Sequence, residues 1–231
     1  CSDGTVWKYT SRTPVQVSFP GTAINITTVG AAAYLIQTTT DPLACGLWAS
    51  YVGGNDWSQN GPFISVKSKW QSAGAVFPYK EIVGNYNTLH IIDANDNMFA
   101  SGSNVQGEIG NGIEYSPWRT RPSTPWLWNF ANNELVTTPV QIPGKFKNIC
   151  TSNSITWYVY AQDMGSNWYS WGRNKALSLG NGVSLTMNIY ALYPNAIDVP
   201  APRLVTPLSQ SWNVISSFNI NAVPAPLSNP G

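Results

Sequence analysis

One pattern of glycine and asparagine occurs three times in this chain at the same spacing. In each copy two glycines lie eight residues apart, and an asparagine lies two residues after the first glycine. Three copies at one spacing indicate an internal repeat, and a repeat constrains the fold more than any other feature of the chain. The copies are Gly53, Asn55 and Gly61; Gly102, Asn104 and Gly110; and Gly172, Asn174 and Gly180.

The residues before the glycine predict a β-strand that enters a tight turn. Small and aromatic side chains alternate in Met98–Ser101 and in Trp168–Trp171, and a period of two is typical of strands. Glycine is needed at such a turn where φ is positive or where backbones approach closely, and asparagine tolerates the left-handed region. The repeated unit is therefore expected to consist of strands and turns.

A second element recurs between these copies. Pro14–Val17 reappears as Pro139–Ile142 and, more loosely, as Pro202–Val205, and a run rich in β-formers follows each of them. Successive copies of the glycine pattern begin roughly 50 to 70 residues apart, which suits propeller blades of several short strands better than a helical solenoid. No segment shows the periodicity of an amphipathic helix.

Composition excludes several classes of protein. Charged residues make up 10% of the 231 residues and the net charge is +1, so the clustered excess of Lys and Arg that nucleic-acid binding needs is missing. Hydrophobic residues at 43% and aromatic residues at 13% argue against a disordered chain. No run approaches the ~20 apolar residues that a membrane-spanning helix needs.

The repeat resembles that of the RCC1 (regulator of chromosome condensation) family. The third copy carries the family's Trp-Gly-x-Asn as Trp171–Asn174 and its Leu-Gly-x-Gly as Leu179–Gly182. The second copy has Ser101 in place of the tryptophan, and the first copy is degenerate. Asp3–Trp7 resembles the hairpin and the last strand of a preceding blade. The resemblance implies an all-β fold, an RCC1-like β-propeller.

The resemblance also implies a closed ring of seven blades, and this chain has too few units for one. We expect a single propeller segment over 1–231, with a partial unit at 1–11, full units at 14–61, 62–112 and 139–182, and a partial unit at 202–231. An insertion loop at 113–138 separates the second and third full units. Because an open part of a ring exposes sheet edges and an apolar face, we expect a segment of a larger ring, or else a smaller ring or pairing with another subunit.

Groups that could perform catalysis are scarce in the sequence. His90 is the single histidine, and it lies on an apolar strand where a core role is expected. Asp93–Asn97 begins like a calcium loop but lacks the closing Glu, and the repeat places a hairpin turn there. Cys150 lies in a strand-like run and is expected to be a buried free thiol. We therefore predict no catalytic residue, no metal, no cofactor and no enzyme activity.

The insertion loop is the strongest candidate binding site. Propeller loops lie on the faces of the disc, and loops on a rigid scaffold commonly carry binding. Trp, Tyr and Arg are the residue types that dominate interface energetics. The alternative is that these aromatic residues fold back and cap the edge of a blade. The candidate residues are Tyr115, Trp118, Arg119, Arg121, Trp126, Trp128 and Phe130.

These features favour a non-catalytic recognition or scaffold module that binds a protein through loops of one propeller face. Its partner is an unidentified protein, the rest of its own propeller or other subunits of an assembly. The alternatives are a guanine-nucleotide exchange factor for a small GTPase, which the family resemblance implies, an enzyme-inhibitor propeller and a glycan-binding propeller. Few charges and many aromatic residues favour an extracellular or surface-exposed location.

Overall fold

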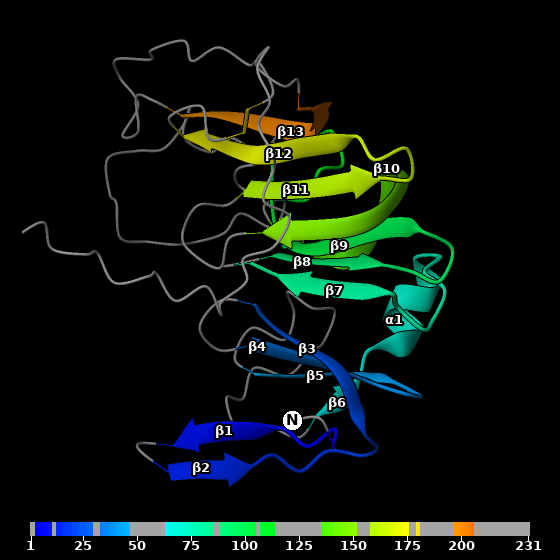
Figure 1. Cartoon of the computed structure of the whole chain (residues 1–231), viewed down its shortest axis with the longest axis vertical. Helices are drawn as coiled ribbons and strands as arrows, with labels where there is room; N and C mark the ends of the chain where they lie inside the picture. The colour runs from blue at the N-terminus through cyan, green and yellow to red at the C-terminus, as the bar shows by residue number, and fades with distance from the viewer. Residues whose placement is uncertain are drawn as a thin grey trace, which may run out of the picture.

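In the described residues, the computed structural model consists mainly of antiparallel strands (Figure 1). It describes residues 3–10, 13–29, 33–46, 63–85, 88–104, 107–113, 135–151, 158–175, 179–180 and 196–205. Within these ranges the strands form a two-stranded, a four-stranded and a seven-stranded sheet. The two-stranded sheet is a hairpin of β1 (Trp7–Thr10) and β2 (Thr13–Gln16).

The four-stranded sheet, here called sheet 1, follows the hairpin along the chain. Its order is β3-β4-β5-β6, which is also the order of its strands in the sequence. Its four strands hold no charged residue, and Leu35, Ile36 and Ala44 are fully buried. Its strands are β3 (Ala23–Val29), β4 (Ala33–Thr38), β5 (Pro42–Gly46) and β6 (Ile64–Ser65).

The seven-stranded sheet is two four-stranded sheets that share one long strand, β10 (Leu135–Thr151). The first part of β10 pairs with β9 as far as Lys145, and the part from Phe146 pairs with β11. We call these halves sheet 2 and sheet 3. Sheet 2 also has β7 (Glu81–Gly84), β8 (Thr88–Ile92) and β9 (Asn97–Ser103); sheet 3 also has β11 (Tyr158–Asp163), β12 (Trp168–Lys175) and β13 (Ala196–Leu204).

Sheets 2 and 3 have the same register. His90 pairs with Ala100 in sheet 2, and Tyr160 pairs with Ser170 at the same place in sheet 3. Positions in sheet 1 are matched in the same way, by counting paired residues from the hairpin turn. Gly46 of sheet 1 then holds the position of Gly102 in sheet 2 and Gly172 in sheet 3. The sequence alignment placed Gly53 there, so the first copy of the repeat was aligned in the wrong register; Gly53 itself lies outside the described residues.

The three Pro-x-x-Val segments lie in strands that pair with the last strand of the preceding unit, two of them as the fourth strands of sheets 2 and 3 and one in the β1–β2 hairpin. Pro14 lies in β2, Pro139 in β10 and Pro202 in β13. Each of these strands pairs with the strand that follows the preceding hairpin turn. A sheet therefore takes its outer strand from the start of the next sequence unit.

A short helix, α1 (Lys67–Ser72), lies between sheets 1 and 2. The sequence analysis did not predict it. With six residues and one buried side chain, Trp70, the helix is too short to show a period of 3.6 in the sequence. It belongs to the segment that leads from β6 to β7.

The apolar core consists of two layers, and each layer joins two successive sheets. A single sheet can bury its apolar face only against another element. The first layer joins sheets 1 and 2 around Leu35, Trp70 and Phe99. The second joins sheets 2 and 3 around Ile142, Phe146 and Trp171.

The first strands of the three sheets also approach one another closely. The backbone N–H of Gly84 in β7 donates to Thr27 Oγ1 in β3 at 2.8 Å. The carbonyl oxygen of Gly84 accepts from Thr151 Oγ1 in β10 at 3.1 Å. Gly84 is thus the meeting point of three sheets, and a side chain there has no room.

We expect Gly84→Ala to lower the free energy of unfolding by about 1–3 kcal/mol. A Cβ at this position would lie 2.0 Å from the Thr28 carbonyl oxygen, and strand backbone cannot move aside as a flexible side chain can. Urea unfolding followed by circular dichroism measures the change. The control is Gly165→Ala, near the flexible Asn167 side chain on an exposed hairpin, where a change within about 0.5 kcal/mol is expected. Equal losses in both variants would contradict the close approach of β3 and β7.

Candidate functional site

Two hairpin turns at one end of sheets 2 and 3 are built in the same way around an aspartate. Asp93 Oδ1 accepts the backbone N–H of Asn97 at 2.8 Å, and Asp163 Oδ1 accepts that of Asn167 at 2.8 Å. In both turns the second carboxylate oxygen accepts from the side-chain amide of the asparagine. Asp96 and Ser166 hold the left-handed conformation, with φ of 64° and 70°, as expected for the third residue of a three-residue hairpin loop.

The carbonyl oxygen of Glu108 joins sheets 2 and 3. Trp171 Nε1 donates to it at 3.0 Å, and His90 Nε2 lies 3.0 Å from it. Because a carbonyl oxygen only accepts, the proton of neutral His90 lies on Nε2. Gly110, with φ of 83°, passes under the indole, where a Cβ would lie 2.5 Å from Trp171 Nε1. The tryptophan and the glycine of the repeat thus form one contact between neighbouring sheets.

Asn104 fixes the base of the insertion loop. Its side-chain oxygen accepts the backbone N–H of Ile109 at 3.2 Å, and its amide donates to the carbonyl of Ile113 at 3.0 Å. On the returning side, Leu135 pairs with Ser103 in the sheet. The loop therefore leaves and re-enters the fold beside one buried asparagine.

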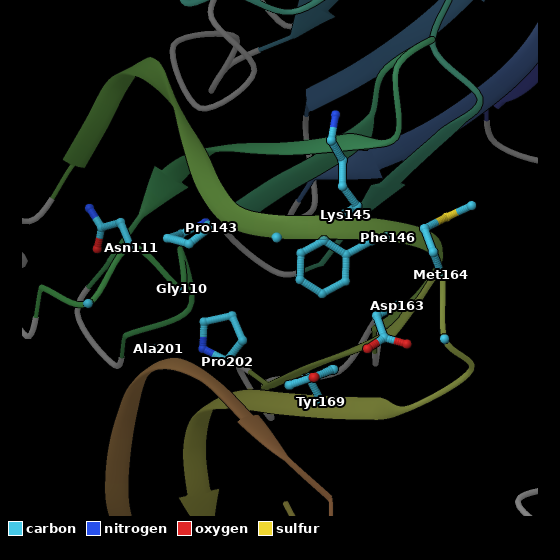
Figure 2. Close-up of a pocket in the computed structure, with 13 residues that line it drawn as sticks. Gly110, Asn111, Pro143, Lys145, Phe146, Asp163, Met164, Tyr169, Ala201 and Pro202 are labelled. Carbon is cyan, nitrogen blue, oxygen red and sulfur yellow. The ribbon is translucent and has the colours of Figure 1, made fainter.

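A cavity of about 500 Å³ opens between sheets 2 and 3 (Figure 2). The bend of β10 forms one wall, the Asp163–Asn167 hairpin forms the second, and β13 forms the third. Lys145 contributes backbone and stem, because its ammonium donates to Asn95 O and Asn97 Oδ1, both at 2.7 Å. The residues that line the cavity include Pro143, Phe146, Asp163, Met164, Tyr169 and Pro202.

Asp163 is the charged group of this cavity. Hydrogen bonds from Asn167 and from the Tyr169 hydroxyl lower the pKa of Asp163 below its usual value. The same carboxylate raises the pKa of Tyr169, after the larger effect of burial. Asp163 is therefore an anionic acceptor at neutral pH.

A second titratable group of side chains lies where β7 meets β10. Glu81 Oε2 accepts the backbone N–H of Ile149 at 2.8 Å, and burial raises the pKa of Glu81 despite that bond. Burial and the charge of Glu81 raise the pKa of the Cys150 thiol, and burial raises that of Tyr160 to about 12. None of these shifts activates a nucleophile, because the thiol and the phenol are held in their protonated forms.

The structure places the other candidate residues as follows. His90 is buried in the second core layer, next to Trp171. Asp93–Asn97 forms a hairpin turn, and the described part of the chain holds no cluster of three potential metal ligands. Cys150 is exposed, contrary to the prediction, because it alternates with buried Ile149 on the first strand of sheet 3. Cys45 is the buried cysteine among the described residues.

Among the repeat residues, Gly102, Asn104, Gly110, Trp171 and Gly172 are buried. Gly102, Gly110, Gly172 and Gly180 all have positive φ, which explains why glycine recurs there. Asn174 lies in β12. Asn55 and Gly61 lie outside the described residues, as do Tyr115, Trp118, Arg119, Arg121, Trp126, Trp128 and Phe130 of the insertion loop.

Solved structures of RCC1-like propellers share this fold. The yeast RCC1 protein Prp20, in its complex with Kap60, superposes with a TM-score of 0.58 at 15% identity over 87% of this chain. Prp20p from Saccharomyces cerevisiae, described with its binding to Gsp1p and histones, gives 0.57 at 14% over 87%. Human WBSCR16 gives 0.53 at 14% over 85%.

The chain has the RCC1-like β-propeller fold, as the sequence predicted. It spans 40%, 42% and 41% of the length of these three structures, and the number of blades in a full ring stays a prediction. No family model and no curated protein sequence matches the chain. None of the helices in the described ranges is long and apolar enough to span a membrane.

Sequence reasoning missed the cavity between sheets 2 and 3. One signal was present in the sequence. Asp and Asn occur at the same spacing in Asp93–Asn97 and Asp163–Asn167, and an aromatic residue, Phe99 or Tyr169, follows two positions after the asparagine. That signal identifies the turns. It does not show that one of them borders an open cavity.

The buried histidine predicts a pH dependence of stability. Burial lowers the pKa of His90 from 6.5 to about 4. In the unfolded chain His90 binds a proton below pH 6.5, whereas in the fold it stays neutral down to about pH 4. We therefore expect the free energy of unfolding to fall as the pH drops from 6.5 to 4, by about 3 kcal/mol in total.

His90→Gln isolates this effect, because glutamine can still donate to the Glu108 carbonyl but does not titrate. Glu81, whose pKa is raised, acts in the opposite direction, and it does so equally in both proteins. Urea unfolding at pH 7, 5.5 and 4 should show a steeper loss for the unmodified chain. Parallel curves would mean that His90 is hydrated in the fold.

Proposed function

We propose that this chain is a non-catalytic recognition module that binds a protein partner through the insertion loop. The observation that carries the proposal is the clamp at Asn104, which holds the carbonyl of Ile113 beside the Leu135–Ser103 pair. A long loop rich in Trp and Arg is thereby presented from a buried, hydrogen-bonded base. Loops on rigid scaffolds are the usual carriers of binding.

The neighbouring structures support a protein as the ligand. Prp20 is seen bound to Kap60, and Prp20p is described with its binding to Gsp1p and histones. These partners belong to those proteins. For this chain we propose only the class, a folded protein recognised by aromatic and arginine side chains.

We also propose that the chain works within a larger assembly. Ile26, Ile82 and Ile149 occupy equivalent positions on the first strands of the three sheets. Ile82 and Ile149 are 3% and 6% exposed, whereas Ile26 is 47% exposed. The first sheet thus presents an apolar face that its counterparts bury. Further strands of a propeller or another subunit would cover it.

A guanine-nucleotide exchange factor is the second candidate. It is favoured by the likeness to Prp20p, which is described with its binding to Gsp1p. Nucleotide release from a small GTPase in the presence of the chain separates exchange from simple binding. An extracellular or surface-exposed location completes the proposal and is supported by the low share of charged residues, 10%.

Alanine replacement of Trp118, Trp126 and Trp128 is expected to weaken binding to a protein partner at least tenfold. Truncation of interface tryptophans commonly costs 2 kcal/mol or more. The dissociation constant of a partner identified by cross-linking and pull-down measures the effect. Trp7→Ala is the control, because Trp7 is exposed on β1, in a different sheet from the base of the loop. An unchanged affinity in the triple variant rejects the loop as the binding site.

Ile26→Thr is expected to reduce self-association of the isolated chain. Threonine keeps the β propensity of the strand but removes apolar surface from the uncovered face. Light scattering after size-exclusion chromatography should show a larger share of monomer than for the unmodified chain. Val15→Thr, which changes an exposed apolar residue on the β1–β2 hairpin, is the control. A monomeric unmodified chain at tens of micromolar contradicts the need for a covering partner.

A further inference from the structure

The segment that leads from β6 of sheet 1 to β7 of sheet 2 lies beside the hairpin turn Asp93–Asn97. In that segment Val76 donates its N–H to Asp93 Oδ2 at 3.1 Å and accepts from Ala94 N–H at 3.0 Å. Gly74 lies next to the ring of Phe99, and Ala75 belongs to the same core layer as that ring. A short apolar stretch after the turn at Ala73 and Gly74 is thus held by two hydrogen bonds of its backbone and lies near one aromatic ring.

The equivalent crossing from sheet 2 to sheet 3 lacks this stretch. It consists of the short bend at Pro143 and Gly144 within β10. One contact between the crossing segment and the hairpin is present at both places. The Lys147 ammonium donates to Ser166 Oγ, as the Lys80 ammonium donates to Asp96 Oδ1. The inner part is replaced by the cavity.

Each group that holds Val76 has a counterpart at this cavity. Strand register makes Asp163 equivalent to Asp93, Met164 to Ala94 and Tyr169 to Phe99. Phe99 is buried, whereas Tyr169 faces the cavity beside Phe146 (Figure 2). Asp163 accepts from Asn167, from the backbone N–H of Gly165 and from the Tyr169 hydroxyl. Among the described residues, no N–H of a crossing segment reaches it as Val76 reaches Asp93.

We propose that this cavity is a docking site for an extended apolar peptide segment of a partner protein. One residue of the segment donates its backbone N–H to Asp163 and accepts from the backbone N–H of Met164. A small or β-branched side chain precedes an aromatic one, as in Ala75–Phe77, and both pack on Tyr169 and Phe146. Recognition by backbone pairing plus an apolar pocket is a common mode of peptide binding.

The charge of the cavity supports a neutral or cationic peptide. Asp163 is ionised at neutral pH, and the Lys145 ammonium is engaged by the neighbouring hairpin. An anionic ligand would therefore meet a carboxylate with no facing cation among the described residues. This site is separate from the insertion loop, so the inference does not rest on the function proposed above.

The chain itself supplies the probe. The acetylated and amidated hexapeptide with the sequence of Ser72–Phe77 is titrated into the full chain, and the shifts of backbone NMR resonances report the dissociation constant. Asp163→Asn retains the oxygen that accepts the backbone N–H of Asn167. It replaces the second oxygen, which accepts from the Asn167 amide and in this proposal from the peptide, by a donor, so the dissociation constant should rise at least tenfold. Asp96→Asn makes the same charge change on the neighbouring hairpin and should leave it unchanged.

A second variant tests the other hydrogen bond. Met164→Pro removes the backbone N–H at the second position of the turn, where proline suits the backbone, and it should also weaken binding at least tenfold. A peptide methylated on the valine nitrogen cannot donate to Asp163 and should bind at least tenfold more weakly to the unmodified chain. The triple tryptophan variant of the insertion loop should bind the hexapeptide normally.

Two results would overturn the proposal. The first is absence of binding at millimolar peptide to a folded chain, which would mean that the cavity is filled from within or is not a peptide site. The second is binding that survives Asp163→Asn, Met164→Pro and N-methylation alike. If the hexapeptide does not bind while the insertion loop binds its partner, this proposal fails and the proposed function stands. If the hexapeptide binds while the insertion loop binds no partner, the proposed function fails and this proposal stands.

Discussion

The contact between sheets 2 and 3 depends on one acceptor, the carbonyl oxygen of Glu108, which lies 3.0 Å from both Trp171 Nε1 and His90 Nε2. Apolar packing alone is not directional, and two flat apolar faces can slide over one another. A buried carbonyl that receives two ring nitrogens fixes the position of one sheet on the next. Gly110 makes the contact possible because no other residue leaves room for the indole. The tryptophan and glycine of the repeat motif thus fix how one sheet packs on the next. Each sheet buries its apolar face only against its neighbour.

Because the sheets are alike, differences between the crossing segments decide where the surface is open. The crossing before sheet 2 carries α1 and seals its groove with Trp70 and Val76. The crossing before sheet 3 is the bend in β10, and its groove stays open. A change in the length of one connection thereby converts a core contact into a binding surface without altering the sheets. Repeat folds accept such changes readily, since connections lie outside the shared sheet register.

The sequence was sufficient for the fold class and for the repeat glycines, because positive φ and close backbone approach leave few alternatives at Gly102, Gly110 and Gly172. The sequence was insufficient to align the first copy of the repeat, because that copy is degenerate. Gly53 was aligned in place of Gly46, since the Asn that marks the motif elsewhere does not follow Gly46 at the same spacing. The cavity could not be predicted, because its existence depends on which connection fills which groove, and this is a property of packing.

The base of the insertion loop adjoins the cavity. The cavity is bordered at one end by Gly110, Asn111 and Gly112, and the insertion loop begins at the next residue, Ile113, which Asn104 holds in place. We propose that one partner protein engages both the loop and the cavity. Under that geometry the docked segment needs little affinity of its own, because tethering raises its effective concentration to about the millimolar range. A shallow site with two backbone hydrogen bonds and one aromatic wall then suffices to set the orientation of the partner, while the loop supplies most of the affinity.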